Sequence, residues 1–233
     1  MPGAAVTELF TEHVVAALIR QARLREAAGD DPQGWTVDLR RGRLRLGQRE
    51  LAAEPIGTEA YSNDTFVWAW GNPGMEGIAT PAALAVRAVG EERRIEELLD
   101  DFEIPLDRLD AFVASVLTVG IAGLDAYLLA PYEEEGSGVL ALGIRDARLL
   151  AGAPHAMSIV SAFTDMLMGT PPPFSHRRAF AHYLAAPLAA VPAEVRGGSV
   201  VLQAADGPVL VKLDREGRIA EAKAEVPGSG GSY

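Results

Sequence analysis

Cysteine is absent from this 233-residue chain. The absence excludes disulfide bonds, thiol catalysis and thiolate metal sites, and it fits a reducing compartment, so we expect a cytoplasmic location. Histidine is scarce as well. No two of the four histidines have the spacing that places a pair of metal ligands on one helical turn, so we expect no metal site and no cofactor. These residues are His13, His155, His176 and His182.

The sequence also lacks a long apolar run. The longest one, Ala111 to Leu124, contains two glycines and ends before Asp125, and it is shorter than the roughly 20 apolar residues of a membrane-spanning helix. It predicts a buried core helix. Because the first residues show no basic region followed by an apolar segment and a cleavage site, a signal peptide is not indicated, and we expect no membrane partner.

Sequence marks of catalysis are missing too. The chain has no GxxxxGK[ST] phosphate loop, no GxGxxG between a strand and a helix, and no GxSxG nucleophile motif. Asp125 with Tyr127 could supply a general base if the carboxylate were buried, or Asp125 could simply end a helix. His176 and His182 beside two arginines suggest either a small anion site or a solvated helix face, and the acidic run 133–135 is typical of a solvated turn. No catalytic residue is assigned.

Negative charge dominates the composition. There are 32 acidic against 21 basic residues, which gives a net charge of -11. This excess repels nucleic acid and anionic lipid, and it suits a basic protein partner. The hydrophobic fraction of 48% and the charged fraction of 23% are those of an ordinary folded protein.

The most informative segment present is 65–71, in which aromatic and small residues alternate. This pattern predicts a strand with Phe66, Trp68 and Trp70 on one face. The aromatic face could fill the core, or Trp68 and Trp70 could line a cleft, with Asn72 at its rim before a Pro-Gly break. Tyr61 and Asp64 are the other polar side chains that we expect near such a pocket.

Hydrophobic periodicity and turn residues predict an α+β fold, with helices covering antiparallel sheet and a β-meander at the C-terminus. We expect a main domain over 1–192, the meander over 193–226, and a flexible tail of linker composition over 227–233. Helices are predicted at 7–28, from 80, at 91–100, 107–119, 156–168 and 175–188. Strands are predicted at 35–39, 43–46, 56–61, from 65, and at 127–132, 139–144, 200–203, 209–213 and 218–226.

Two short motifs carry a resemblance to a known family. Ile56-Gly57-Thr58, followed by Phe66-Val67-Trp68-Ala69-Trp70-Gly71-Asn72 and a helix near Thr80, resembles an uncharacterised bacterial family with a Gly-Thr and Trp-x-Trp-x-Asn signature. The resemblance covers roughly Leu9 to Ile144. It implies a bacterial origin and a domain of unknown function, and it implies no activity.

The function expected from these features is binding. The first hypothesis is a non-enzymatic cytosolic interaction protein, a regulator or an immunity-type partner of another protein. The alternative is a small-molecule-binding domain or an enzyme with a pocket beside the Trp68 and Trp70 strand. A homodimer through the apolar helix or an edge of the meander is a further possibility.

Overall fold

The structure is a computed structural model, and it describes residues 1–28, 34–131, 137–146, 148, 152–169, 171, 173–186 and 191–225. Within them the helices are α1 (Ala4–Ala28), α2 (Pro81–Arg93), α3 (Ala111–Ala122), α4 (Ala156–Met168) and α5 (His176–Ala185), with short 3-10 helices η1 (Pro73–Met75) and η2 (Glu96–Leu98). The strands are β1 (Trp35–Asp38), β2 (Arg43–Leu46), β3 (Arg49–Ala60), β4 (Thr65–Trp68), β5 (Ile104–Pro105), β6 (Ala126–Pro131), β7 (Gly138–Ile144), β8 (Ala193–Arg196), β9 (Ser199–Ala204), β10 (Gly207–Leu213) and β11 (Ile219–Ala224).

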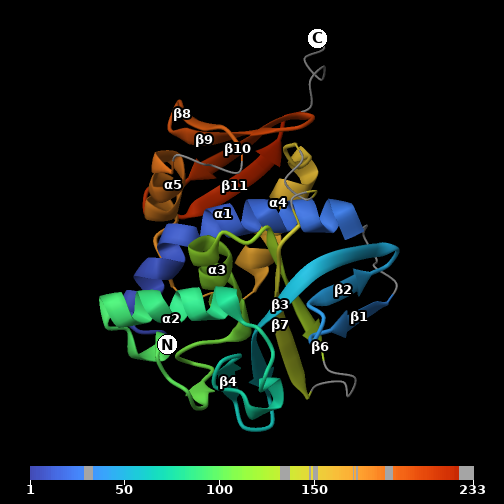
Figure 1. Cartoon of the computed structure of the whole chain (residues 1–233). Coiled ribbons are helices and arrows are strands. Elements are labelled where there is room, and N and C mark those ends of the chain that lie inside the picture. Colours follow the sequence, from blue (N-terminus) through green and yellow to red (C-terminus); the bar gives the residue numbers. More distant parts are fainter. Residues whose placement is uncertain are drawn as a thin grey trace.

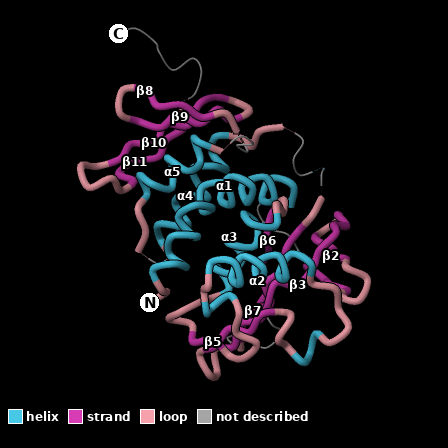
Figure 2. The backbone as a smooth tube through the Cα atoms, turned by 60° about the vertical axis from the view of Figure 1, so that its left-hand side comes forward, coloured by secondary structure: helices cyan, strands magenta, loops and turns pink. Residues whose placement is uncertain are grey.

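The helices lie between two antiparallel sheets (Figures 1 and 2). α2 and α3 pack on the larger sheet, which contains β1 to β7, and α4 packs on the smaller sheet, which contains β8 to β11. α1 runs between these helix pairs and contacts α3, α4 and α5. The expected α+β class and the C-terminal meander are both confirmed, and the meander forms a sheet of its own.

β3 is the strand that organises the larger sheet. Its first part pairs with β2, and its second part pairs with β4 and with β7, which in turn pairs with β6. The strand begins at Arg49, well before the predicted start at Ile56. Pro55 lies inside it at an irregularity in the β7 register, where a residue without an N–H donor is tolerated.

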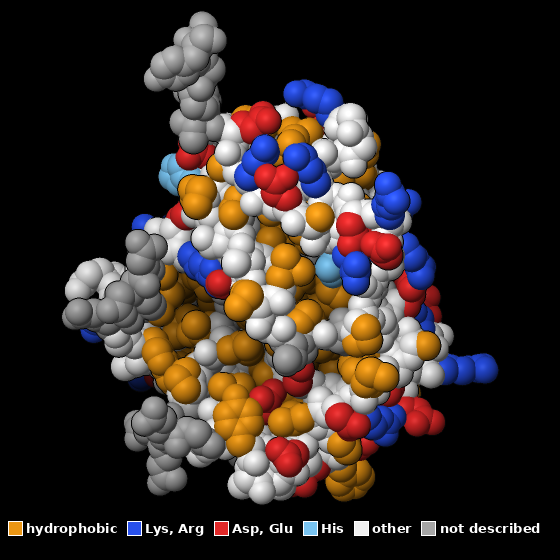
Figure 3. Space-filling model, turned by 180° about the vertical axis from the view of Figure 1, so that it is seen from behind, with side chains coloured by type: hydrophobic (Ala, Val, Ile, Leu, Met, Phe, Trp, Pro, Cys, Tyr) orange, Lys and Arg blue, Asp and Glu red, His pale blue; other side chains and the backbone are white. Residues whose placement is uncertain are grey.

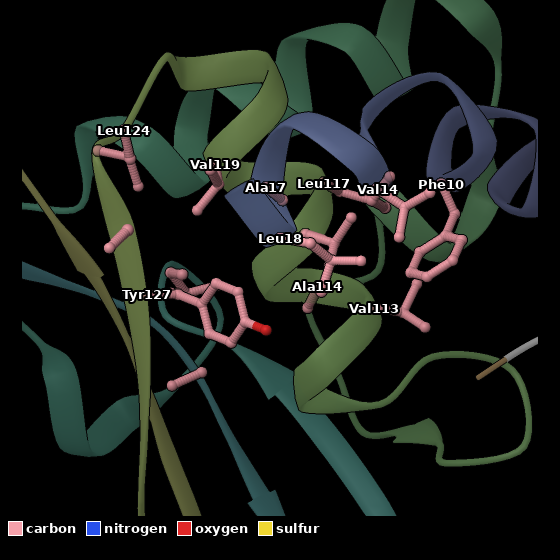
Figure 4. Close-up of a cluster of buried hydrophobic side chains, with 14 of the residues drawn as sticks. Phe10, Val14, Ala17, Leu18, Val113, Ala114, Leu117, Val119, Leu124 and Tyr127 are labelled. Atoms are coloured by element: carbon pink, nitrogen blue, oxygen red, sulfur yellow. The ribbon is translucent and has the colours of Figure 1, made fainter. Parts of the chain in front are cut away.

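α1 is buried on more than one face because it has helices on both sides. Its buried positions include Leu9, Phe10, Val14 and Leu18, and Figure 4 shows several of these packing against Leu117 and its neighbours on α3. A surface helix would carry only one apolar stripe, so this distribution identifies a central helix. α1 thereby joins the two halves of the molecule.

Side chains that lie outside α3 cap both of its ends. At the N-terminus, Asp110 accepts a hydrogen bond from the Val113 N–H at 2.7 Å, and Glu59 on β3 accepts one from the Ala111 N–H at 2.7 Å. At the C-terminus, Arg20 on α1 donates to the carbonyls that close the helix. These contacts satisfy terminal backbone groups and match the helix dipole. The helix therefore starts at Ala111, later than the predicted 107.

The C-terminal sheet contains one strand that was not predicted from the sequence. β8 over Ala193–Arg196 adds a fourth strand to the meander, beyond the three read from the sequence. The sheet lies within the predicted 193–226, and its status as a separate domain stays a prediction. The predicted tail, 227–233, lies outside the described residues. In the described part of the chain, no helix combines the length and the apolarity that a membrane crossing requires.

Candidate functional site

The aromatic strand β4 faces the interior. Phe66 and Trp68 are completely buried, and their rings meet edge to face with centroids 5.1 Å apart. The indole N–H of Trp68 donates a hydrogen bond to the backbone carbonyl of Glu97 at 2.9 Å. Because both the apolar ring and its polar edge are satisfied inside the protein, these two side chains serve the core.

The remaining residues of the Gly-Thr and Trp-x-Trp-x-Asn motifs also contact one another. Asn72 donates its amide N–H to Oγ1 of Thr58 at 2.9 Å and accepts from the Gly74 N–H at 2.8 Å, which caps η1. Gly57 lies directly under Phe66, and a Cβ atom there would come within 2.4 Å of the ring. The motif is thus a self-contained structural unit that fastens β4 to β3.

Trp70 is the one aromatic residue of this segment that reaches the surface. It is half-buried and stacks on Trp68 with centroids 4.7 Å apart, and the Arg87 guanidinium lies 5.9 Å from its ring centre. Its indole N–H has no hydrogen-bond partner among the described residues. Beside it is an open depression of about 390 Å³. The lining includes Trp70, Asn72, Pro73, Met75, Ile78 and Leu84.

Tyr61 and Asp64 do not line this depression. Asp64 occupies the left-handed region, φ 53°, in the turn between β3 and β4, and its carbonyl accepts from the Leu106 N–H. Tyr61 is 45% exposed. Burial of its hydroxyl raises the pKa of Tyr61, and the nearby Glu59 carboxylate raises it further. Of the five residues predicted as a site, only Trp70 and Asn72 line the depression, while Trp68 is in the core and Tyr61 and Asp64 lie outside the lining.

A larger hollow lies between α1, α4 and β6. Figure 3 shows the molecule from behind, with hydrophobic side chains gathered around a hollowed centre. Two adjoining cavities, of about 440 and 770 Å³, share the lining residues Gln21, Arg25 and Leu128. We call the pair the rear cleft. The smaller cavity is lined by Leu18, Gln21, Arg25, Asp110, Phe112, Tyr127, Leu128, Leu129, Ala162, Asp165, Met166, Gly169 and Pro171.

A few polar groups stand on these mostly apolar walls. Arg25 of α1 forms an ion pair with Asp165 of α4, which links the two sides of the cleft. Gln21 accepts a hydrogen bond from the Tyr127 backbone N–H at 3.3 Å. The Tyr127 hydroxyl has no hydrogen-bond partner among the described residues, and Figure 4 shows its ring reaching from β6 toward α1 and α3. Burial raises the pKa of Tyr127, so the hydroxyl stays neutral.

Asp110 is a second carboxylate in the lining of the smaller cavity. Burial raises the pKa of Asp110, and the negative charge of Glu59 acts in the same direction, while the backbone N–H of Val113 opposes both. In the part of the chain that is described, no ion pair joins Asp110 to a cation. In the lining of the smaller cavity, Arg25 therefore neutralises the Asp165 carboxylate, whereas the Asp110 carboxylate has no cation beside it among the described residues.

Asp125 and His176, which were also considered from the sequence, each accept a hydrogen bond from a backbone N–H group. Asp125 is buried and accepts a hydrogen bond from the Asp146 N–H at 2.6 Å, so it holds the end of β7. His176 accepts from the Ile219 N–H at 2.8 Å, and this contact joins α5 to the meander. The acidic run 133–135 lies outside the described residues. Within the described ranges, no three His, Asp or Glu side chains gather in a way that could hold a metal ion.

The rear cleft was not predicted because its residues are distant in sequence. Leu18, Gln21 and Arg25 lie on one face of α1, at the helical spacing of three and four residues, and Tyr127 comes from β6. The sequence pairs Tyr127 with Asp125, yet the structure gives Asp125 a backbone partner and places Tyr127 in the cleft. The available signal for the cleft was the pair of polar residues, Gln21 and Arg25, that follow Leu18 on the same face of α1.

A comparison with protein-family models gives one match. Residues 7–144 match a family of unknown function, DUF6882. The matched range agrees with the resemblance read over Leu9 to Ile144 and contains the whole aromatic motif, α1, α3 and β6. Searches of the curated proteins and of the solved structures found no significant match. The chain belongs to this family of unknown function, DUF6882.

Proposed function

We propose that the chain is a non-catalytic binding protein that holds a small, largely apolar molecule in the rear cleft and works in the cytosol. The observation that carries the proposal is the smaller cavity of the rear cleft, of about 440 Å³. Ligand sites are concave, have volumes of roughly 300–1,000 Å³, and combine apolar walls with a few placed polar groups. The cytosolic part of the proposal rests on the absence of cysteine.

The chemistry of the lining supports a ligand of this kind. Leu18, Phe112, Leu128 and Met166 offer apolar surface from three helices and a strand. The Tyr127 hydroxyl and the Gln21 amide are neutral groups that could orient a bound molecule. Each square ångström of apolar surface that a ligand covers contributes about 25 cal/mol before the costs of binding.

The polar residues that line the larger cavity of the rear cleft favour binding over catalysis. Glu26 lies 3.3 Å from Nδ1 of His155, and Ser158 follows on the next turn of α4. A nucleophile is activated through a hydrogen bond to its base. No such bond joins His155 to Ser158 among the described residues, and the His155 side chain is 62% exposed. The three residues therefore lack the relay that would make Ser158 reactive.

The proposal is tested with Nile red, a neutral dye that fluoresces in apolar sites, on a pair of matched variants. Leu128→Trp places an indole where the two cavities of the rear cleft meet. Leu84→Trp places the same side chain in the depression beside Trp70. Both leucines are only partly buried, so both variants are expected to fold. We expect Leu128→Trp to weaken dye binding by at least about tenfold, which corresponds to 1.4 kcal/mol.

Leu84→Trp is expected to bind Nile red as the unchanged protein does. The same titration, repeated as competition against a metabolite library, then identifies natural ligands of the rear cleft. Equal binding by the unchanged protein and Leu128→Trp would refute the proposed site. Loss of binding in Leu84→Trp alone would instead place a small-molecule site beside the tryptophan strand, as the sequence alternative holds.

A second candidate function is recognition of a protein partner, as a regulator or an immunity-type protein. The observation in its favour is the depression at Trp70, where Leu84 is 47% exposed. Phe102 is exposed and follows Asp101, whose carbonyl lies against Gly71. Apolar patches with an aromatic residue are typical of partner surfaces. A basic partner bound there should change Trp70 fluorescence, and Leu84→Asp should weaken that response while Leu128→Trp should not.

A homodimer is a further proposal, and few surfaces of the described residues could form its interface. The apolar helix α3 is buried between α1, α2 and the larger sheet, so it offers no surface to a second copy. Within the described residues, β8 and β11 each pair on one side only, and they form the edges of the meander. Such edges can pair with another chain. Light scattering across a concentration range would detect a dimer.

A further inference from the structure

The charge in the rear cleft is unevenly distributed. Arg25 and Asp165 form a pair, so each neutralises the other. Asp110, which lines the same cavity as this pair, has backbone N–H groups of α3 as partners and no cation among the described residues. An apolar cavity with one unpaired carboxylate attracts positive charge because a buried charge without a counterion is costly.

The dipole of α3 does not cancel this negative charge. The N-terminus of a helix carries about half a positive elementary charge. Two carboxylates, Asp110 and Glu59, accept hydrogen bonds from the first turn of α3. With both ionised, more than one negative charge remains beside the first turn of α3. The net charge of the chain, -11, adds a long-range field of the same sign.

Aromatic rings stand beside the carboxylate. Phe112 is two residues after Asp110, and its ring lies edge to face with Tyr127, with centroids 6.3 Å apart. Both rings line the smaller cavity. Ring faces attract ammonium groups, and the attraction grows when water is excluded. Carboxylate and rings together form a suitable environment for one protonated amine attached to an apolar body.

We infer that the ligand of the rear cleft is a lipophilic amine, with its ammonium group at Asp110 and its apolar part along Leu18, Leu128 and Met166. This inference rests on the proposed function, since it names the class of ligand for the same cleft. A carboxylate ligand is disfavoured at Asp110 by repulsion, and Arg25 is already engaged by Asp165.

The test compares three competitors of equal chain length against bound Nile red: n-octylamine, 1-octanol and octanoate, all below their aggregation concentrations. We expect the amine to compete at least about tenfold better than the alcohol, because a charge-assisted hydrogen bond is stronger than a neutral one. Octanoate should compete least. Equal competition by amine and alcohol would overturn the inference and leave the apolar cleft intact. Failure of all three would contradict the proposed function itself.

Asp110→Asn is the variant that isolates the charge. Asparagine caps helices as well as aspartate does, so the hydrogen bond to Val113 is kept and the fold is expected to survive. The variant should bind octylamine and octanol alike. Asp107→Asn, which removes the same charge from a carboxylate that is 76% exposed and outside the cleft, should keep the preference for the amine. A preference that persists in Asp110→Asn would overturn the assignment.

Discussion

Trp68→Ala is expected to lower the free energy of unfolding by about 3–5 kcal/mol, the range for truncating a buried aromatic side chain. The ring is completely buried between Phe66 and Trp70, so its removal leaves a cavity that both neighbours line. The change also leaves the Glu97 carbonyl without its N–H donor. Since domains are commonly stable by only about 5–15 kcal/mol, this is a large share. Urea denaturation followed by circular dichroism measures it.

Two further tryptophan variants show whether the loss of stability in Trp68→Ala comes from removing a buried ring. Trp35→Ala, at a half-buried position on β1, should cost clearly less than Trp68→Ala. Trp68→Phe keeps most of the apolar volume and removes the hydrogen bond to Glu97, so it should fall between the unchanged protein and Trp68→Ala. If Trp68→Ala were as stable as Trp35→Ala, the tryptophan would not hold the core as described.

Gly57→Ala is expected to destabilise the protein by about 3 kcal/mol, at the upper end of the usual range for overpacking. The added methyl group would lie 2.4 Å from the Phe66 ring and 2.5 Å from the backbone carbonyl of Val67. Phe66 is fully buried and cannot move aside, and the carbonyl belongs to the paired strand β4. Thermal and urea unfolding of the variant measure the cost.

Gly169→Ala serves as the matched control for an added methyl group. Its nearest contact would be 3.4 Å from the Asp165 carbonyl, an ordinary van der Waals distance, and its φ of -72° suits alanine. We expect its stability to change by less than about 0.5 kcal/mol. Equal stability of the two variants would show that Gly57 is not required by close packing, and the structural interpretation of the motif would lose its clearest support.

Local patterns predicted most of the secondary structure because the relevant forces are local. Alternation and the Arg41-Gly42 turn predict the β1–β2 hairpin, and Pro81 marks the start of α2. The errors arise where a distant contact decides. β3 extends through Pro55 because a register irregularity accommodates the missing donor. At the start of α3, the local cap Asp110 is joined by Glu59, which lies on another element.

The candidate site was harder to predict, and the aromatic motif illustrates the reason. Its alternation correctly indicates a strand, but only the tertiary contacts show that Trp68 reaches Glu97 and that Asn72 reaches Thr58. The rear cleft requires α1, α4 and β6 to come together, and no periodicity within one segment encodes that arrangement. Of the cleft residues, Tyr127 was considered from the sequence beside a general base, and His155 was considered only as a metal ligand.

The range that matches the family covers only part of the lining of the cleft. One wall, which includes Leu18, Arg25 and Tyr127, lies within residues 7–144. The other wall, which includes Asp165 and Met166 on α4, lies beyond the matched range. Asp110 belongs to the matched part. The wall that α4 supplies is therefore outside the part of the chain that matches the family.

Hydrogen–deuterium exchange with and without bound Nile red tests the central claim, that the rear cleft binds and the aromatic motif supports the fold. The account predicts slower exchange on binding in the peptides that cover 18–25, 126–131 and 156–168, with no change over 69–84. Protection over 69–84, with none at the rear cleft, would contradict it and move the binding site to the depression beside Trp70.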